Sequence, residues 1–265
     1  SPKLSQLTIV ARDPSQATRF DSGNYDMHTA NETGPDAGRY LFTVFETGQS
    51  GVQRHDLHTG VTDTIWQSPS EGGHVAFDAC YWTPWGTLIT AEESWATASA
   101  GSTSPYGRLF ELKNPTEAPG ILNPLTPLSN SGADFVHQNV IPRTSHEGIQ
   151  FDRDGNMYFI DELNGGNVYK YTSAAKLSAV KSGDADYFAA GQTFVLRVGD
   201  GMTPNATGAY TWVPFTTAAG TALSGALTIT DSNGVTSVDA RNTTNLAPFK
   251  GTDYQRPEDL QIQEK

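Results

Sequence analysis

The sequence has a single cysteine, Cys80, so it cannot close an internal disulfide, and cysteine content leaves the redox compartment open. Its apolar runs all fall short of the roughly 20 residues that a membrane-spanning helix needs, so we expect no membrane partner. Basic residues are scarce as well, with 17 Lys and Arg against 29 Asp and Glu and a formal net charge of −12. Because nucleic-acid-binding surfaces are basic, we also expect no nucleic-acid partner.

The residues that are abundant favour β-structure. Charged residues make up only 17% of the chain, whereas it contains 26 glycines and 15 prolines. This composition is typical of short strands joined by many turns. A chain of 265 residues is long enough to bury one core, and we expect one all-β domain over residues 1–265.

The most informative stretch runs from Ser145 to Glu162. Two alternating apolar runs, 148–151 and 157–160, flank an Asp154-Gly155 pair, which is a β-hairpin signal. The start of the first strand and the end of the second lie at the same edge of a hairpin. Glu147 and Glu162 should therefore meet at one rim, where their repulsion calls for a cation or a proton.

The same frame recurs along the chain. Asp78, Gly86 and Glu93 repeat the spacing of Glu147, Gly155 and Glu162, with eight residues to the glycine and seven more to the second acid. A looser copy is the strand 40–45, which ends before Glu46, and a further copy begins at Arg256. Repeats of short strands with glycine-rich turns predict the blades of a β-propeller.

The other elements are expected from local patterns. Three strands are predicted over 39–66, and others at 6–11, 108–112, 168–171, 193–198 and 210–215. Residues 226–230 form either a further strand or part of an excursion on the rim. A short helix is predicted around 175–181, and the proline-rich stretch 115–142 is predicted to be a long loop. Cys80 is expected to be a small buried residue, and Trp82 and Trp85 to pack between blades.

Three motifs resemble one family. His146-Glu147-Gly148 with its Asp-Gly turn, Thr83-Pro84-Trp85-Gly86-Thr87 leading to Glu92-Glu93, and Arg256-Pro257-Glu258-Asp259 are similar to motifs of the PhoX-type alkaline phosphatases and their propeller relatives. The motifs occur in the family's order and span about two thirds of the chain. The resemblance implies a six-bladed propeller, exported to the periplasm or secreted. It also implies a calcium and iron cluster at one mouth of the channel and hydrolysis of small phosphorylated substrates.

One position departs from the family. Five residues before Thr83, where the family has an iron-binding cysteine, this chain has Asp78, and Cys80 follows two residues later. This departure weakens the expectation of iron and of phosphatase activity, whereas it leaves that of calcium in place.

The candidate metal ligands are the acids at matched positions of the repeats. Calcium takes six to eight oxygen ligands and tolerates irregular geometry, which suits acids delivered to one rim by successive blades. The expected ligands are Asp78, Glu93, Glu147, Glu162 and Glu258, with Glu92, Asp161 and Asp259 behind them. Glu147 and Glu258 are also the expected catalytic residues. In the alternative, these acids are solvated or pair with Arg143, Arg153 or Arg256. His146 is expected to orient a carboxylate or to pack rather than to bind a metal.

Three functions stay open. The first is a metal-dependent phosphoric-ester hydrolase, as the resemblance implies. Such an enzyme would have to work through metals, because the chain lacks the motifs of nucleophilic serine enzymes and of nucleotide-binding loops. The second is a calcium-stabilised binding propeller without catalysis, and the third is a calcium-dependent lactonase or esterase. Since the countable blades are too few to close a propeller, we expect an N-terminal part, with a partial blade from 256 and a companion C-terminal fragment.

Overall fold

The computed structural model describes residues 24–70, 72–94, 104–120 and 132–263, and its elements are almost all β-strands. Two compact units emerge. The first comprises Ser1–Ala91 and Phe110–Val136, and the second comprises Glu92–Leu109 and His137–Lys265. The expectation of an all-β fold is confirmed. The strand expected at 6–11 lies outside the described residues.

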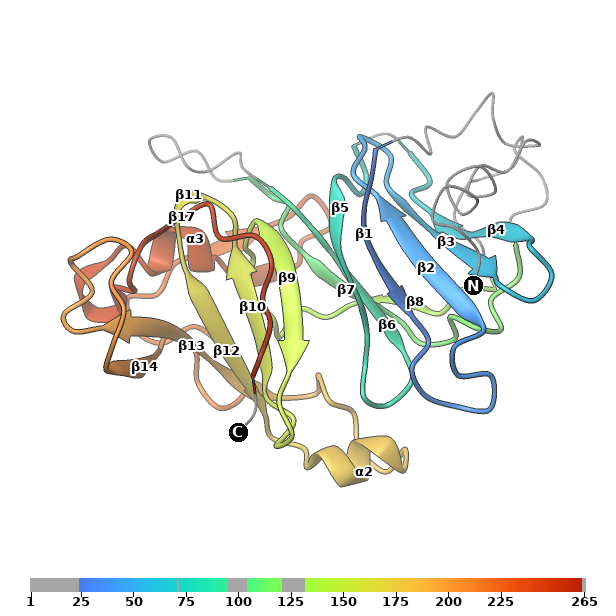
Figure 1. Cartoon of the computed structure of the whole chain (residues 1–265). Helices are drawn as coiled ribbons and strands as arrows, with labels where there is room; N and C mark the ends of the chain where they lie inside the picture. The colour runs from blue at the N-terminus through green and yellow to red at the C-terminus, as the bar shows by residue number, and fades with distance from the viewer. Residues whose placement is uncertain (1–23, 71, 95–103, 121–131, 264–265) are drawn as a thin grey trace. The chain divides into compact units, whose positions relative to one another are not determined.

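The first unit contains a four-stranded antiparallel sheet. Its strands are β1 (Tyr25–Ala30), β2 (Tyr40–Phe45), β3 (Gly51–Asp56) and β4 (Thr62–Gln67), in the spatial order β1-β2-β3-β4 (Figure 1). Each strand therefore pairs with its neighbour in sequence. The three strands expected over 39–66 are confirmed.

A second four-stranded sheet follows. It consists of β5 (Phe77–Trp82), β6 (Leu88–Glu92), β7 (Leu109–Leu112) and β8 (Phe135–His137), in the order β5-β6-β7-β8. A tight turn joins β5 to β6, and Gly86 adopts a φ of +91° there, which only glycine adopts readily. The prediction of one continuous loop over 115–142 is wrong at β8. Pairing with β7 extends these residues, as the bond from Lys113 N–H to Asp134 O shows.

Aromatic residues form the core of the first unit. Trp66 of β4 stacks on Phe77 of β5 with their ring centroids 5.7 Å apart, and Trp82 stacks on Phe42 of β2 at the same distance. Trp66 and Trp82 are at most 5% exposed. The expectation that Trp82 packs between two sheets is thus confirmed, because β2 and β5 belong to different sheets.

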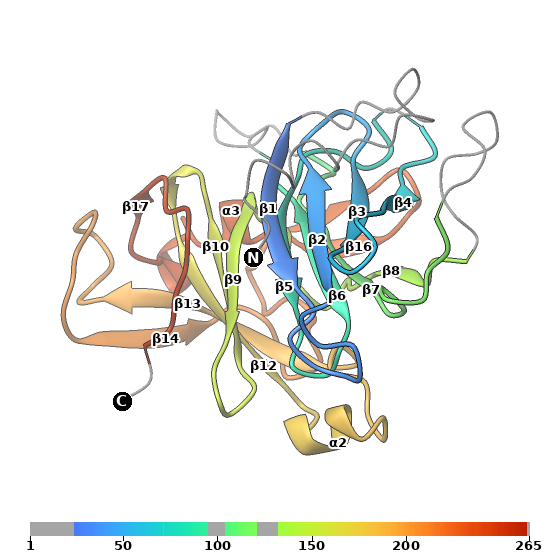
Figure 2. The same cartoon turned by 45° about the vertical axis from the view of Figure 1, so that its right-hand side comes forward.

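The second unit is built on a five-stranded antiparallel sheet with the order β14-β13-β12-β10-β9. The strands are β9 (His146–Phe151), β10 (Met157–Asp161), β12 (Val168–Ser173), β13 (Gly191–Val198) and β14 (Tyr210–Pro214), and β14 lies at one edge (Figure 2). One face is buried, with Phe159 of β10 stacked on Tyr169 of β12 at 5.1 Å. Strands β12, β13 and β14 confirm the expected strands.

Shorter elements complete the second unit. Strand β11 (Asn164–Gly166) pairs with β17 (Tyr254–Gln255), and β15 (Thr228–Thr230) pairs with β16 (Thr236–Val238). The helices are α2 (Leu177–Lys181), as expected, α3 (Ala240–Thr243) and the 3-10 helix η1 (Ala247–Phe249). Residues 256–263, expected to open a strand, form no regular strand. Among the described residues, no helix is long and apolar enough to cross a membrane.

Candidate functional site

The hairpin of β9 and β10 brings His146-Glu147, at the start of β9, and Asp161-Glu162, at the end of β10, to one edge. Asp161 lies opposite His146 in the register, and the backbone N–H of Glu162 donates to Ser145 O at 2.9 Å. At the other end, Gly155 adopts a φ of +85° and closes the turn with a bond to Asp152 O. The hairpin prediction is confirmed, and Glu147 and Glu162 lie at the same edge of the sheet.

Glu162 is the most buried of these candidate ligands in the second unit. Its residue is 2% exposed, although its carboxylate reaches the edge where Arg256 lies. Oε1 accepts hydrogen bonds from Nε of Arg256 at 2.9 Å and from its Nη2. Oε2 is buried and has no hydrogen-bond partner among the described residues. Since a buried charged oxygen without a partner is costly, Glu162 is suited to an additional cation.

The segment after β17 runs beside β9 (Figure 1) and carries the third motif. The N–H of Gly148 donates to Glu258 O at 3.2 Å. A Cβ at Gly148 would lie 2.5 Å from the backbone nitrogen of Leu260, so only glycine permits this approach. Packing therefore explains why the His-Glu-Gly motif has a glycine at its third position. This glycine lets the Arg-Pro-Glu-Asp segment lie against the hairpin edge.

Arg256 lies among the acids of this edge. Its guanidinium, 52% exposed, contacts Glu162 and also Glu258 Oε1 at 3.5 Å. The hydrogen bond to Glu162 raises the pKa of Arg256, and the charges of Glu162, Glu258 and Glu93 add to this effect. Glu93 is thus close enough to interact electrostatically with this group. Arg256 therefore pairs with one acid of the motifs, Glu162, as the alternative interpretation expected.

Glu92, the acid before Glu93, has a different role. Its side chain is fully buried, and Oε2 accepts hydrogen bonds from the backbone N–H groups of Gly107 and Arg108, both at 3.0 Å, and from Arg108 Nε at 2.9 Å. Oε1 accepts a further bond from Arg108 Nη2 at 2.5 Å. Glu92 is the partner of a buried arginine, which makes it unsuited to the supporting metal role expected for it.

His146 and Asp161 lie beneath the edge. Burial lowers the pKa of His146 to about 3, with the charge of Arg241 acting in the same direction, and the ring packs on Phe159 at 5.5 Å. Burial raises the pKa of Asp161 to about 7, although a hydrogen bond from Ser145 N–H at 3.0 Å opposes the rise. These contacts agree with the prediction that His146 packs.

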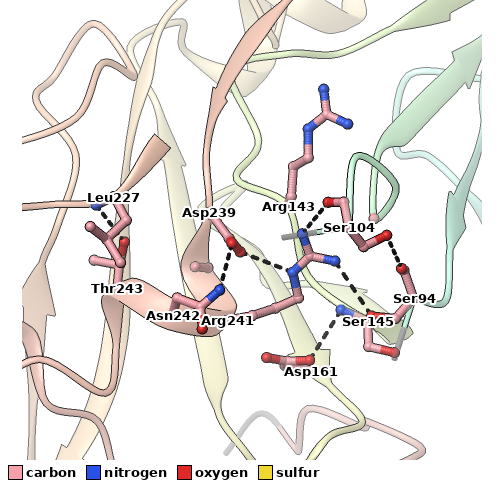
Figure 3. A network of polar contacts seen from close by, with 12 residues as sticks. Ser94, Ser104, Arg143, Ser145, Asp161, Leu227, Asp239, Arg241, Asn242 and Thr243 are labelled. Atoms are coloured by element: carbon pink, nitrogen blue, oxygen red, sulfur yellow. Dashed lines mark hydrogen bonds and ion pairs between the residues drawn. The ribbon is translucent and has the colours of Figure 1, made fainter. Parts of the chain in front are cut away.

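A buried network around Arg241 borders the edge (Figure 3). Arg241 of α3 donates from Nε to Asp239 Oδ1 at 2.9 Å, from Nη2 to Ser104 O at 3.0 Å and from Nη1 to Ser94 O at 3.4 Å. The charge of Arg241 also opposes the rise in the pKa of Asp161 that burial causes. Sequence reasoning missed Arg241, because no motif or spacing marks the stretch around it.

Two predicted residues belong to the first unit. Asp78 is the second residue of β5 and is 1% exposed, and its metal-binding role stays a prediction. Cys80 is 5% exposed, and burial raises the pKa of its thiol well above the ordinary value. The expectation of a buried Cys80 is confirmed, and a thiol held protonated in this way is a poor ligand for iron.

The side chains of this edge fit calcium in their chemistry, although they do not form a closed cluster. Among the residues that the structure describes, no three His, Cys, Asp or Glu side chains converge closely enough to hold a metal ion. The donor chemistry nevertheless fits calcium, because the edge offers carboxylate oxygens and one of them, Oε2 of Glu162, is buried without a partner. Glu93, Glu147, Glu162 and Glu258 stay the predicted ligands in the second unit.

Comparison with known proteins gives a family and a fold. The family model described as "Alkaline phosphatase PhoX" matches residues 70–265. PhoX of Pseudomonas fluorescens, solved in complex with vanadate, a transition state analogue, superposes with a TM-score of 0.53 at 16% identity. The match covers 89% of this chain and 55% of that one, so the chain spans about half the length of this relative.

A second solved structure is more distant. A protein described as a putative gluconolactonase aligns with a TM-score of 0.36 at 12% identity, over 90% of this chain and 65% of that one. No curated protein sequence matches this chain significantly.

Proposed function

Because the chain belongs to the PhoX family of alkaline phosphatases, we propose that the protein is a calcium-dependent phosphoric-ester hydrolase that acts on small phosphomonoesters. The observation that carries the proposal is the buried Oε2 of Glu162, which has no hydrogen-bond partner among the described residues. It lies at the edge shared by Glu147 and by the segment that carries Glu258. An oxygen in this setting is stabilised by a cation with oxygen-ligand preference.

The residues of the edge have two proposed roles, calcium binding and binding of the phosphoryl group. Glu93, Glu147, Glu162 and Glu258 would hold calcium, and Asp78 is proposed as a further ligand. When bound, calcium would polarise the phosphoryl oxygens and offset the negative charge of the acids. Arg256 is half-exposed and bonded to Glu162, so it brings to the edge a positive charge that would attract an anionic phosphoryl group.

The finer features of the fold follow the same proposal. The sheets β1–β4, β5–β8 and β9–β14 are proposed as blades of a six-bladed propeller whose channel mouth carries the acids. A location in the periplasm or outside the cell is proposed from the family. Calcium is the proposed metal, since the family's iron-binding cysteine is replaced by Asp78 and Cys80 is buried as a thiol.

Hydrolysis of p-nitrophenyl phosphate by the purified protein tests the proposal. With calcium supplied, the wild-type protein should release p-nitrophenol, and Glu147→Gln should lower kcat at least 100-fold, because one carboxylate ligand is lost. The fold of the variant, checked by circular dichroism, should be unchanged. If neither protein hydrolyses the ester with calcium or iron present, the non-catalytic binding propeller becomes the better interpretation.

A further inference from the structure

Arg241 holds both ends of the segment between β6 and β7. Its Nη1 lies 3.4 Å from Ser94 O, and its Nη2 lies 3.0 Å from Ser104 O. The hydroxyls of Ser94 and Ser104 also bond to each other at 2.9 Å (Figure 3). One guanidinium therefore fixes two backbone positions that are ten residues apart in the sequence.

One of these positions adjoins a proposed calcium ligand. Ser94 directly follows Glu93, which is one of the proposed calcium ligands. The other end of the segment is joined to the hairpin edge, since Thr144 N–H donates to Gly107 O at 3.2 Å. A Cβ at Gly107 would lie 2.3 Å from Thr144 O, so the two backbones are in close contact.

The fork geometry of arginine is what this position requires. Arg241 is 2% exposed, and its Nε is held by Asp239, whose other oxygen accepts from Asn242 Nδ2 at 2.9 Å. With Nε fixed in this way, the two Nη atoms are oriented towards the carbonyls. Lysine would keep the positive charge beside Asp239, but it could not bond both carbonyls from a fixed plane.

We infer that Arg241 is a positioning residue that holds Glu93 in place for calcium binding, through Ser94 and Ser104. This inference rests on the calcium site of the proposed function. Arg241 contacts neither the metal nor a substrate in this account. It acts on the affinity for calcium because an acid held in place loses less conformational entropy when the ion binds.

Calcium affinity measured by isothermal titration calorimetry tests the inference. Arg241→Lys should weaken calcium binding about 10-fold or more, at a temperature where circular dichroism shows the variant to be folded. Arg54→Lys is the matched control. Arg54 also bonds backbone carbonyls and an aspartate; its carbonyl partners are those of Pro115, Thr116 and Ala118, and all of its partners lie within the first unit. The affinity of the Arg54→Lys variant for calcium should stay within about twofold of the wild type.

A double-mutant cycle separates positioning from general loosening. In the Glu93→Gln background, Arg241→Lys should have no further effect beyond about twofold, because the two residues act through the same ligand. If Arg241→Lys does not fold, Asp239→Ala takes its place, since it removes the oxygen that accepts from Nε of Arg241 and should weaken calcium binding several-fold.

Two outcomes would overturn the inference alone. One is that the Arg241→Lys variant binds calcium with wild-type affinity. The other is that Arg241→Lys lowers the calcium affinity as much in the Glu93→Gln background as it does in the wild type. A wild-type protein that binds no calcium would refute the proposed function, and this inference with it.

Discussion

The pair formed by Glu92 and Arg108 allows a sharp test of the structure. Glu92 is fully buried, and its two oxygens accept four hydrogen bonds, two from backbone N–H groups and two from the guanidinium of Arg108. Glu92→Gln keeps the shape of the side chain but replaces one acceptor oxygen with an N–H₂ donor. That donor would face N–H groups, and the buried charge of Arg108 would lose its partner.

The loss of folding stability in Glu92→Gln follows from the removal of one partner of a buried ion pair. Removal of one partner typically costs about 3–5 kcal/mol, because the remaining charge stays buried and uncompensated. For a domain of 150–250 residues, 1 kcal/mol corresponds to about 2–4 °C in Tm. Glu92→Gln is therefore expected to lower the Tm by about 6–20 °C, the product of these two ranges.

Differential scanning calorimetry measures this shift. The matched control is Glu117→Gln, since Glu117 is an exposed glutamate and its substitution should change stability by less than about 0.5 kcal/mol. Both proteins should be measured with a chelator present, so that a change in metal binding does not contribute. A Glu92→Gln variant that melts within 2 °C of the wild type, where about 6 °C or more is expected, would refute the buried ion pair.

Two further predictions concern ionisable groups of the second unit. Burial lowers the pKa of His137 to about 4, with the charges of Arg143 and Arg108 adding to the effect, so between about pH 6.5 and 4 the unfolded state binds a proton that the folded state does not. Stability should fall by up to about 3 kcal/mol as the pH drops through this window, and His137→Gln should reduce that loss in urea titrations; an unchanged pH dependence would contradict this. Glu162→Gln should abolish the rise in Tm that calcium gives the wild type, because a buried ligand oxygen is lost; a full calcium-induced rise in the variant would argue against Glu162 as a ligand.

Local signals in the sequence predicted the hairpin that carries the site. The Asp154-Gly155 pair encodes a turn with positive φ, which brings the start of β9 and the end of β10 to one edge, and two-residue alternation fixes which of their residues share a face of the sheet. Both are properties of neighbouring residues, so they are readable without the fold. The packing reason for Gly148 was not readable, because it depends on a backbone more than 100 residues further along the chain.

The sequence could not predict interactions that arise only from tertiary contacts. Strand β8 is three residues long and exists because β7 pairs with it. Arg241 contacts Ser94, 147 residues earlier, and no spacing rule links two such positions. Glu92 and Glu93 are both glutamates at the end of β6. The structure separates them, because Glu92 turns to the buried Arg108 while Glu93 acts on Arg256 at the edge.

We propose that the acidic edge binds calcium and that hydrolysis of phosphomonoesters depends on it. The most direct test is to strip the wild-type protein with a chelator and to follow p-nitrophenyl phosphate hydrolysis as free calcium is restored. We expect activity to be lost on stripping and to return with a saturable calcium dependence, whereas Glu147→Gln should stay inactive throughout. Full hydrolysis by the stripped protein, or no hydrolysis at any calcium concentration, would contradict it.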